Sequence, residues 1–375
     1  MLPQEIISDI LSHLPAKSIC RFRCVSKPWK SLLSQPHFIK THLNRTKQLL
    51  ADGEASLIFV SHDSCSLYST HLKYTHHLSH NITTFATKLS FDNHLFSYAN
   101  VFHMVSCDGL ILVKDKKNKS LLINPTTREI KELPTSPYAL NPRFSNTVYG
   151  LGYDSVNDDY KVVTVSYYHN FHGYDHCSTK MFVNVYSVRK GTWQRAESSP
   201  HDYDIGFSFS SGIFVDGHIH WLGARLSNNA SSFIAAFDLG EDNFCKLSIP
   251  TWVASNHLVE LGGCLCCYPS VMLATGNATD VYMMKEYGVM KSWAKFTVIH
   301  PEHLSLRPLC LLGTNQLVLV KNEGSIGAKL VMYNLAGGSS KDIVVHGIPN
   351  EFFVGGSFME SLVSPHCTTE AVTHC

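Results

Sequence analysis

The sequence predicts a small all-α bundle at the N-terminus followed by one large all-β domain, propeller-like with about six blades. Apolar residues follow a helical period up to about Leu49, and after it they form short runs separated by Gly, Asn, Asp and Pro. In the second region, paired hairpins recur about every 45–60 residues, which is typical of four-stranded blades. Seven blades or an incompletely closed ring are the alternatives.

Composition excludes several classes of protein. The chain has 375 residues, of which 44% are hydrophobic and only 16% charged, and its net charge is +1. This balance favours a well-packed fold and argues against nucleic acid or a membrane surface as partner. No apolar run approaches the ~20 residues of a membrane span, and the N-terminus does not have the pattern of a signal peptide. We therefore expect the 12 cysteines to be reduced and mostly buried.

The first predicted helix follows Pro3, a residue that suits a first turn because its missing N–H is harmless there. Apolar residues then recur along one wide stripe, and Pro15 ends the helix. The stripe consists of Ile6, Ile7, Ile10, Leu11 and Leu14.

Three more short helices are predicted before the strands begin. The second runs from about Lys17 to Cys24, the third follows Ser26 as its N-cap, and the fourth begins after Pro36. A bundle of about 45 residues cannot bury all its apolar side chains, and surplus apolar surface marks a partner site. The alternative is an ordinary helical cap that packs on its own domain.

Three motifs in this stretch, LPQEII, ILSHLPAKSICRFRCVSKPW and LLSQPHFIKTHL, resemble an F-box. The resemblance implies docking on a Skp1-like adaptor and, through it, on a cullin and a RING protein. The motif begins at residue 2, so we expect a preceding segment to be missing and adaptor affinity to be reduced. We assign adaptor binding to Leu2, Pro3, Ile7, Ile10, Leu11, Leu14, Pro15, Ile19, Phe22, Val25 and Trp29.

Two kinds of hairpin make up the repeat in the β domain. One is an apolar run, a tight turn and a second run, as at residues 105–113, 212–222, 258–268 and 309–319. The other is a strand, a polar turn and a strand, as at residues 121–134 and 183–193. The first unit, from Leu57 to about Tyr98, is weak. A ring must close, and residues 351–363 supply a strand that we expect to pair with residues 57–60.

The β domain also carries family motifs. INPTTREIKELP, GLGYDSVNDDYKVV, VYSVRKGTWQR, GHIHWLG and DVYMMKEYGVMKSWAKFTVI are similar to the F-box-associated domain of the plant F-box/kelch-repeat family. That family includes the pollen S-locus F-box proteins and a negative regulator of immune-receptor levels. The kelch name fits imperfectly, because the double-glycine signature occurs only three times. We divide the chain into an F-box at residues 1–44, the propeller domain at 45–363 and a flexible tail at 364–375.

The resemblance implies the non-catalytic substrate receptor of a ubiquitin ligase, active in cytoplasm and nucleus. The substrate is a protein, with immune receptors and S-ribonucleases as suggested classes. One alternative is an F-box protein that acts without a ligase. Another, a hydrolase or sugar-binding propeller, lacks a supporting motif: the sequence contains no nucleophile elbow, P-loop or dinucleotide fingerprint. We therefore predict no catalytic residue and no cofactor.

Remaining candidate sites have simpler interpretations. The Cys264–Cys267 pair has no second pair at zinc spacing, and alternation along a strand explains these cysteines better, so no metal is predicted. Trp193, Trp221 and Trp293 recur at blade positions and are expected in the core. Exposed aromatic and histidine side chains in a long loop suit a protein interface, so we assign substrate binding to Tyr168, His169, Phe171, His172 and Tyr174.

Overall fold

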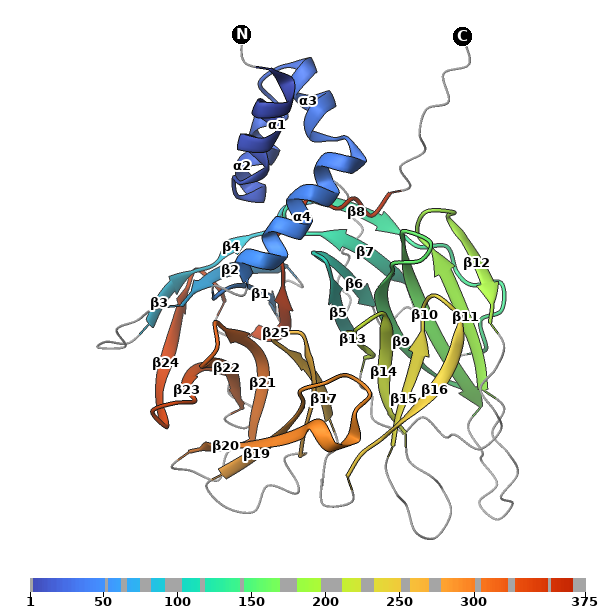
Figure 1. Ribbon diagram of the computed structural model, residues 1–375, viewed down its shortest axis with the longest axis vertical. Coiled ribbons are helices and arrows are strands. Elements are labelled where there is room, and N and C mark those ends of the chain that lie inside the picture. The colour runs from blue at the N-terminus through green and yellow to red at the C-terminus, as the bar shows by residue number, and fades with distance from the viewer. Residues whose placement is uncertain are drawn as a thin grey trace.

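A computed structural model gives the fold as four helices above a six-bladed propeller (Figure 1). It describes residues 3–50, 53–61, 66–74, 82–91, 103–114, 119–141, 145–168, 181–196, 211–223, 233–250, 257–269, 278–300, 305–322, 328–349 and 352–366. The predicted class, a small α bundle followed by an all-β propeller of about six blades, is confirmed. The helices are α1 (Gln4–Ser12), α2 (Ala16–Phe22), α3 (Lys27–Leu33) and α4 (Pro36–Leu50).

Four of the six blades are antiparallel sheets of four strands that follow one another in the chain. They are β5 (His103–Cys107), β6 (Leu110–Lys114), β7 (Ser120–Asn124) and β8 (Glu129–Glu132); β9 (Ser145–Asp154), β10 (Asp159–Tyr168), β11 (Met181–Ser187) and β12 (Thr192–Arg195); β13 (Ile213–Val215), β14 (His218–Gly223), β15 (Phe233–Asp238) and β16 (Asn243–Ser248); and β17 (His257–Leu261), β18 (Cys264–Tyr268), β19 (Ala278–Met284) and β20 (Trp293–Ile299), with the short 3₁₀ helix η2 (Met290–Ser292) before β20.

The ring closes through strands from opposite ends of the β domain. Strand β25 (Phe352–Phe358) pairs antiparallel with β1 (Glu54–Ser61), and β2 (Leu67–Lys73) and β4 (Thr87–Lys88) complete that blade. The predicted pairing of the C-terminal strand with residues 57–60 is therefore confirmed. The first blade is thus built from both ends of the β domain, and this pairing holds the ring closed.

The weak first repeat unit contributes strands to two blades. Strand β3 (Ile82–Phe85) leaves that unit and pairs in parallel with β24 (Ser339–His346). It becomes the fifth strand of the last blade, beside β21 (Ser305–Leu312), β22 (Gln316–Asn322) and β23 (Ala328–Asn334). The first and last blades are thus joined at their outer strands as well as at β25.

Asparagine and aspartate side chains fix the polar turns of the repeat. Each accepts hydrogen bonds from the backbone N–H groups two and three residues ahead, which is the Asx-turn arrangement. Asx turns of this kind end β7, β9, β15 and β23, whereas β11 ends at Ser187, whose hydroxyl accepts from the Lys190 N–H instead. The acceptors are Asn124, Asp154, Asp238 and Asn334.

The hydrophobic core lies between neighbouring blades, because each blade is packed against the blades on either side of it. On β10, Val163 and Val165 pack toward the following blade, whereas Val162 packs with the preceding one. Alternate side chains of a strand point to opposite faces of its sheet. A strand whose sheet has a blade on each face therefore requires a nearly continuous apolar run. The run of buried residues along β10 meets that requirement.

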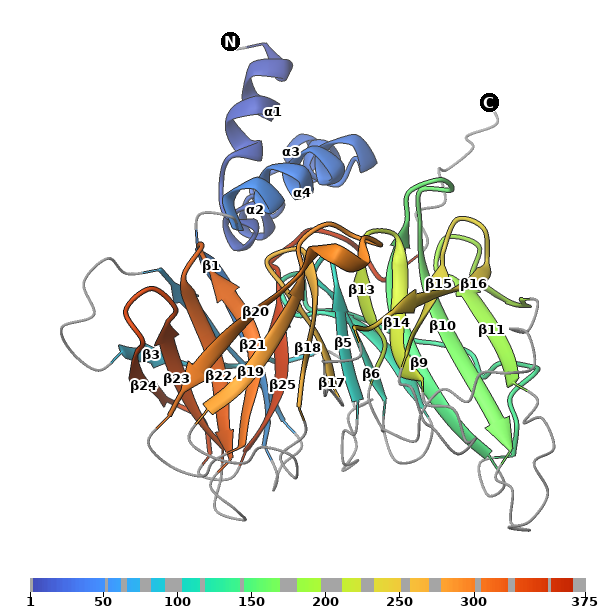
Figure 2. The same cartoon turned by 60° about the horizontal axis from the view of Figure 1, so that its bottom comes forward.

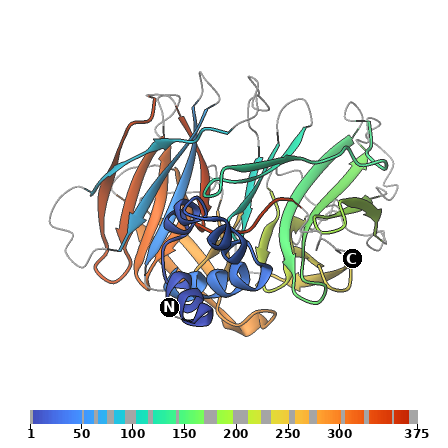
Figure 3. The same cartoon turned by 90° about the horizontal axis from the view of Figure 1, so that it is seen from above.

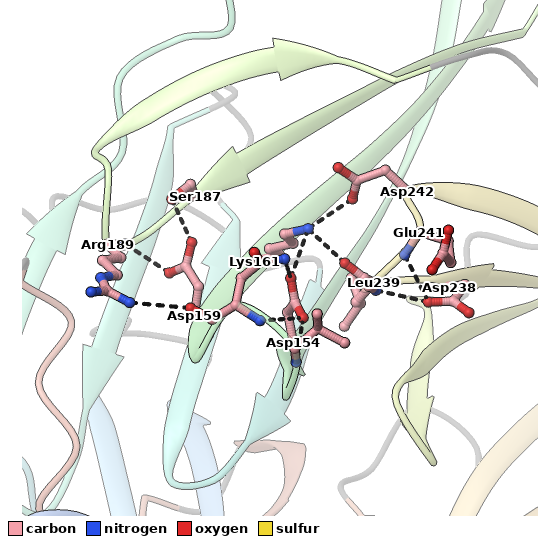
Figure 4. A network of polar contacts seen from close by, with 12 residues as sticks. Asp154, Asp159, Lys161, Ser187, Arg189, Asp238, Leu239, Glu241 and Asp242 are labelled. Atoms are coloured by element: carbon pink, nitrogen blue, oxygen red, sulfur yellow. Dashed lines mark hydrogen bonds and ion pairs between the residues drawn. The ribbon is translucent and has the colours of Figure 1, made fainter. Parts of the chain in front are cut away.

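A buried cation joins the third and fourth blades (Figure 4). The Lys161 ammonium lies 2.9 Å from Asp154 and 2.9 Å from Asp242, and it donates to the Leu239 carbonyl at 2.6 Å. The side chain of Asp154 is fully buried. Burial acts to raise the pKa of Asp154, but hydrogen bonds from Asn157 and Lys161 outweigh it and hold that pKa below its ordinary value.

The helices stand on one face of the propeller (Figures 2 and 3). That face carries the tight turns that follow the innermost strands, such as Asp108–Gly109 between β5 and β6. The opposite ends of the strands, including Tyr168 at the end of β10, point away from the helices. The propeller therefore has a helix-bearing face and a far face.

Candidate docking surface and far face

Proline and serine residues position the helices of the bundle. Pro3 and Pro15 stand at the N-caps of α1 and α2 with extended backbone angles. At the third helix, the Ser26 side chain accepts a hydrogen bond from the Trp29 N–H, so the predicted N-cap is confirmed. Helix α4 continues to Leu50, past the domain boundary predicted at residue 44.

The bundle has a small core of its own, which includes a residue from the far end of the chain. Leu11, Ile19, Leu33 and Phe38 pack together, and Leu362 completes the cluster. Phe22 and Trp29 make an edge-to-face contact at 5.6 Å beside it. The core of the helical bundle therefore includes one side chain from the C-terminal segment.

The predicted apolar stripe of α1 divides into two sides. Leu11 is 5% exposed and points into the core, and Ile7 and Leu14 are half-buried. Ile6 and Ile10 are 46% and 53% exposed, although both are large and aliphatic. Because they are four residues apart, they lie on one side of the helix. This pair, together with exposed Pro3, forms what we call the outer face of α1.

The other residues assigned to the adaptor lie in different environments. Val25, in the turn between α2 and α3, is 64% exposed, and Pro15 is also exposed. Ile19 is fully buried, and Phe22 and Trp29 are half-buried around the bundle core. Leu2 lies outside the described residues. The buried members, Leu11 and Ile19, support the shape of the bundle from inside and present no surface in this conformation.

Ion pairs hold the bundle against the helix-bearing face. Lys40 lies 2.9 Å from Asp158, and Lys17 lies 2.7 Å from Glu360. Hydrogen bonds from Tyr153 and Lys40 hold the pKa of Asp158 below its ordinary value. Farther along α4, Leu43 packs in the apolar core between the second and third blades. Exposed ion pairs are individually weak, so this shared core sets the orientation and the ion pairs refine it.

Of the five residues assigned to substrate, only Tyr168 is described. It is 46% exposed at the far face, and its ring meets Phe182 edge to face at 5.9 Å. The Arg195 guanidinium lies over the ring of Phe182, with its carbon 4.4 Å from the ring centroid. His169, Phe171, His172 and Tyr174 lie outside the described residues.

The alternation predicted along the Cys264–Cys267 strand agrees with the structure, but only four of the eight described cysteines are buried, fewer than expected. Cys264 and Cys266 pack toward one neighbouring blade, and Leu265 and Cys267 pack toward the other. Burial raises the pKa of the Cys264 thiol. Trp221 and Trp293 are buried, and Trp193 is half-buried. Among the described residues no group of three His, Cys, Asp or Glu side chains is arranged to hold a metal ion.

Comparison with known families covers most of the chain. Residues 56–370 match the F-box associated beta propeller domain family, and residues 1–41 match the F-box domain. The chain belongs to the F-box-associated β-propeller family. Helix α4 begins within the F-box match and ends before the propeller match begins.

Individual relatives agree with the family. The chain is 31% identical to the F-box protein CPR1 of Arabidopsis thaliana, over 94% of this chain and 86% of that protein. It is 28% identical to an F-box/kelch-repeat protein of the same plant, over 90% of this chain and 88% of that one. Among solved structures it is similar to TolB from Acinetobacter baumannii, with a TM-score of 0.48, 9% identity, and coverage of 86% and 71%.

An F-box joined to such a propeller is, in general, the substrate-recognition subunit of an SCF-type ubiquitin ligase. F-box proteins are generally non-catalytic and bind Skp1. Among the residues that the structure describes, no helix is long and apolar enough to cross a membrane.

The sequence did not single out every residue that shapes the docking surface. Ile6 belonged to the predicted stripe but was not assigned to the adaptor, although it is nearly as exposed as Ile10. Its place four residues before Ile10 was the available signal. Leu362 and the lysines on α4 had no signal of this kind, because their partners are distant in the sequence.

Proposed function

We propose that this protein docks on a Skp1-like adaptor through the outer face of α1 and Val25, and presents a protein substrate for ubiquitination from its propeller. The observation that carries the proposal is the exposure of Ile6 and Ile10 beside the packed bundle core, with Val25 also exposed in the turn before α3. Contiguous exposed aliphatic residues on a small domain are typical of partner sites. Docking would continue through the adaptor to a cullin and a RING protein.

The attachment of the bundle supports a role in positioning. Because α4 packs on the propeller and is joined to it by Lys40 and Lys47, the bundle and the propeller form one unit. A substrate held on the propeller is then kept at a fixed distance from the adaptor. Tethering in this way raises the effective concentration of substrate lysines near the charged ubiquitin-conjugating enzyme, so the chain itself requires no catalytic group.

For the substrate, we propose an immune receptor, on the strength of the resemblance to the regulator of receptor levels. We also propose that the protein acts in the cytoplasm and nucleus. The far face is the proposed substrate side, since its strand ends point away from the docked adaptor.

Proximity labelling with the proteasome blocked tests this proposal. The intact protein is compared with the double variant Ile6→Asp/Ile10→Asp, and the double variant Ile299→Asp/Val344→Asp, which alters exposed propeller residues, serves as control. We expect adaptor, cullin and ubiquitinated immune receptors with the intact and control proteins only. Equal recovery of adaptor and cullin with all three would contradict the docking assignment. Receptors that are labelled but never ubiquitinated would indicate a ligase-independent interaction protein.

A further inference from the structure

One arginine at the far face lies beside the propeller axis without a carboxylate partner among the described residues. Arg307 is the third residue of β21, an innermost strand that begins at the far face. Its side chain is half-buried and donates from Nη2 to the Val354 carbonyl at 2.7 Å. Its guanidinium carbon lies 5.8 Å from the ring centroid of Phe353.

Aromatic side chains from two neighbouring blades lie near this charge. His257 begins β17 and Tyr268 ends β18, and their rings stack at 5.2 Å with an angle of 26°. Phe353, on β25, is 46% exposed. Four side chains from three blades therefore meet at the far ends of the inner strands: His257, Tyr268, Arg307 and Phe353. We call them the axial cluster.

The axial cluster is electrostatically one-sided. Burial lowers the pKa of Arg307, and burial followed by the positive charge of Arg307 lowers the pKa of His257. Glu260 is on β17 with His257, but at the opposite, helix-bearing end of that strand, where it accepts a hydrogen bond from the Gly263 N–H. A half-buried guanidinium with one carbonyl partner has donors left for an incoming oxyanion, and charge-assisted bonds of this kind are strong and geometrically specific.

We propose that the axial cluster binds an acidic segment of the substrate protein, with a carboxylate or phosphate oxygen on Arg307 and an apolar neighbour against Phe353. The proposal rests on the proposed function, since it names the chemistry of the segment that the propeller selects. Charge complementarity decides the choice of occupant: a basic segment would meet the guanidinium unfavourably, and an apolar one would leave it unpaired. Arginine and aromatic residues are also the side chains that carry most binding energy in protein interfaces.

Peptide selection on the full chain, carried out with and without its adaptor, tests the proposal. A random decapeptide display library is the probe, and we expect enrichment of peptides with Asp or Glu beside an apolar residue. The best peptide is then synthesised with Glu, Gln or phosphoserine at the acidic position, and its dissociation constant is measured by fluorescence polarisation. Tighter binding of the Glu form identifies a carboxylate ligand, and tighter binding of the phosphoserine form identifies a phosphate ligand. Equal binding of the Gln form would overturn the proposal.

Two sets of variants locate the site. Arg307→Gln should weaken binding at least tenfold, while Arg189→Gln, which removes another arginine that donates to one backbone carbonyl, should change it less than twofold. Phe353→Glu places a competing carboxylate beside Arg307 at an exposed position and should also weaken binding at least tenfold. Phe353→Gln, its neutral counterpart, should lose less.

Adaptor binding and melting temperature are measured for every variant. If Arg307→Gln does not fold, the comparison of Phe353→Glu with Phe353→Gln still decides the matter. Equal affinities for that pair, or no enrichment of acidic peptides, would overturn the proposal. Failure to bind the adaptor with peptide selection intact would instead contradict the proposed function and leave the axial cluster standing.

Discussion

The Lys47 ammonium, on the last turns of α4, lies 2.7 Å from the carboxylate of Asp108, which is buried at the first hairpin turn of the second blade. The Tyr160 hydroxyl donates to the same carboxylate at 3.2 Å. Directly after Asp108, Gly109 contacts the segment that carries Leu362 into the helical bundle. One turn thus contacts both the fourth helix and the chain segment that completes the bundle core.

The Asp108–Gly109 turn allows a matched test of this link. At Gly109 an added Cβ would overlap Ser361 Oγ and lie 2.6 Å from the Met359 carbonyl oxygen, and φ is +85°. Gly217 occupies the same kind of turn with φ of +76° and nothing within 4 Å. We expect Gly109→Ala to lower the free energy of unfolding by about 2–4 kcal/mol and Gly217→Ala by about 1 kcal/mol, because both are strained but only one is obstructed. Chemical denaturation measures both, and equal losses would show that the contact with the C-terminal segment contributes nothing.

Truncation of Leu362 should weaken helices that are remote from it in the sequence. Leu362 is 1% exposed within the bundle core, so Leu362→Ala should cost about 2–5 kcal/mol. Hydrogen exchange should show the loss of protection in residues 4–50 before the blades. The exposed Ile299→Ala is the control and should change stability by less than about 0.5 kcal/mol. Unchanged protection of the helices in Leu362→Ala would contradict a shared core.

Removal of the buried cation at Lys161 should be costly near neutral pH. Lys161→Met leaves Asp154 buried without its ion-pair partner, so we expect a loss of about 3–5 kcal/mol at pH 7. Because the pKa of Asp154 is depressed in the folded protein, its contribution is present above its unfolded pKa and is lost as pH falls through the folded value. The difference between wild type and variant should therefore shrink below about pH 4. A difference that stays constant from pH 7 to pH 3 would exclude this ion pair as its cause.

Local patterns predicted the parts of the fold that depend on local chemistry. The Ser26 cap, the polar turns of the repeat and the alternation of Cys264 to Cys267 follow from neighbouring residues. The closing strand was also predictable, because a ring of hairpins requires a partner for its first strand.

Long-range choices were not predictable from such patterns. The four-residue run Ile82–Phe85 has no feature that assigns it to the last blade and not the first, and only the pairing with β24 decides this. Likewise the wide stripe on α1 does not reveal which of its sides the rest of the bundle covers. Leu11 and Ile10 are adjacent in sequence, yet one is 5% and the other 53% exposed. The arginine of the axial cluster had no signal at all, since its aromatic neighbours come from three other strands.

The affinity of the purified protein for a Skp1-like adaptor, measured by isothermal titration calorimetry, tests the central claim most directly. Ile6→Asp/Ile10→Asp should weaken binding by about 2–4 kcal/mol, which is roughly 30- to 1000-fold, because two exposed aliphatic contacts are replaced by charges. Its melting temperature should stay within about 2 °C of wild type, since neither side chain is buried. The control Ile299→Asp/Val344→Asp should bind the adaptor like wild type. Undiminished affinity in a folded Ile6→Asp/Ile10→Asp protein would contradict the claim that the outer face of α1 is the docking surface.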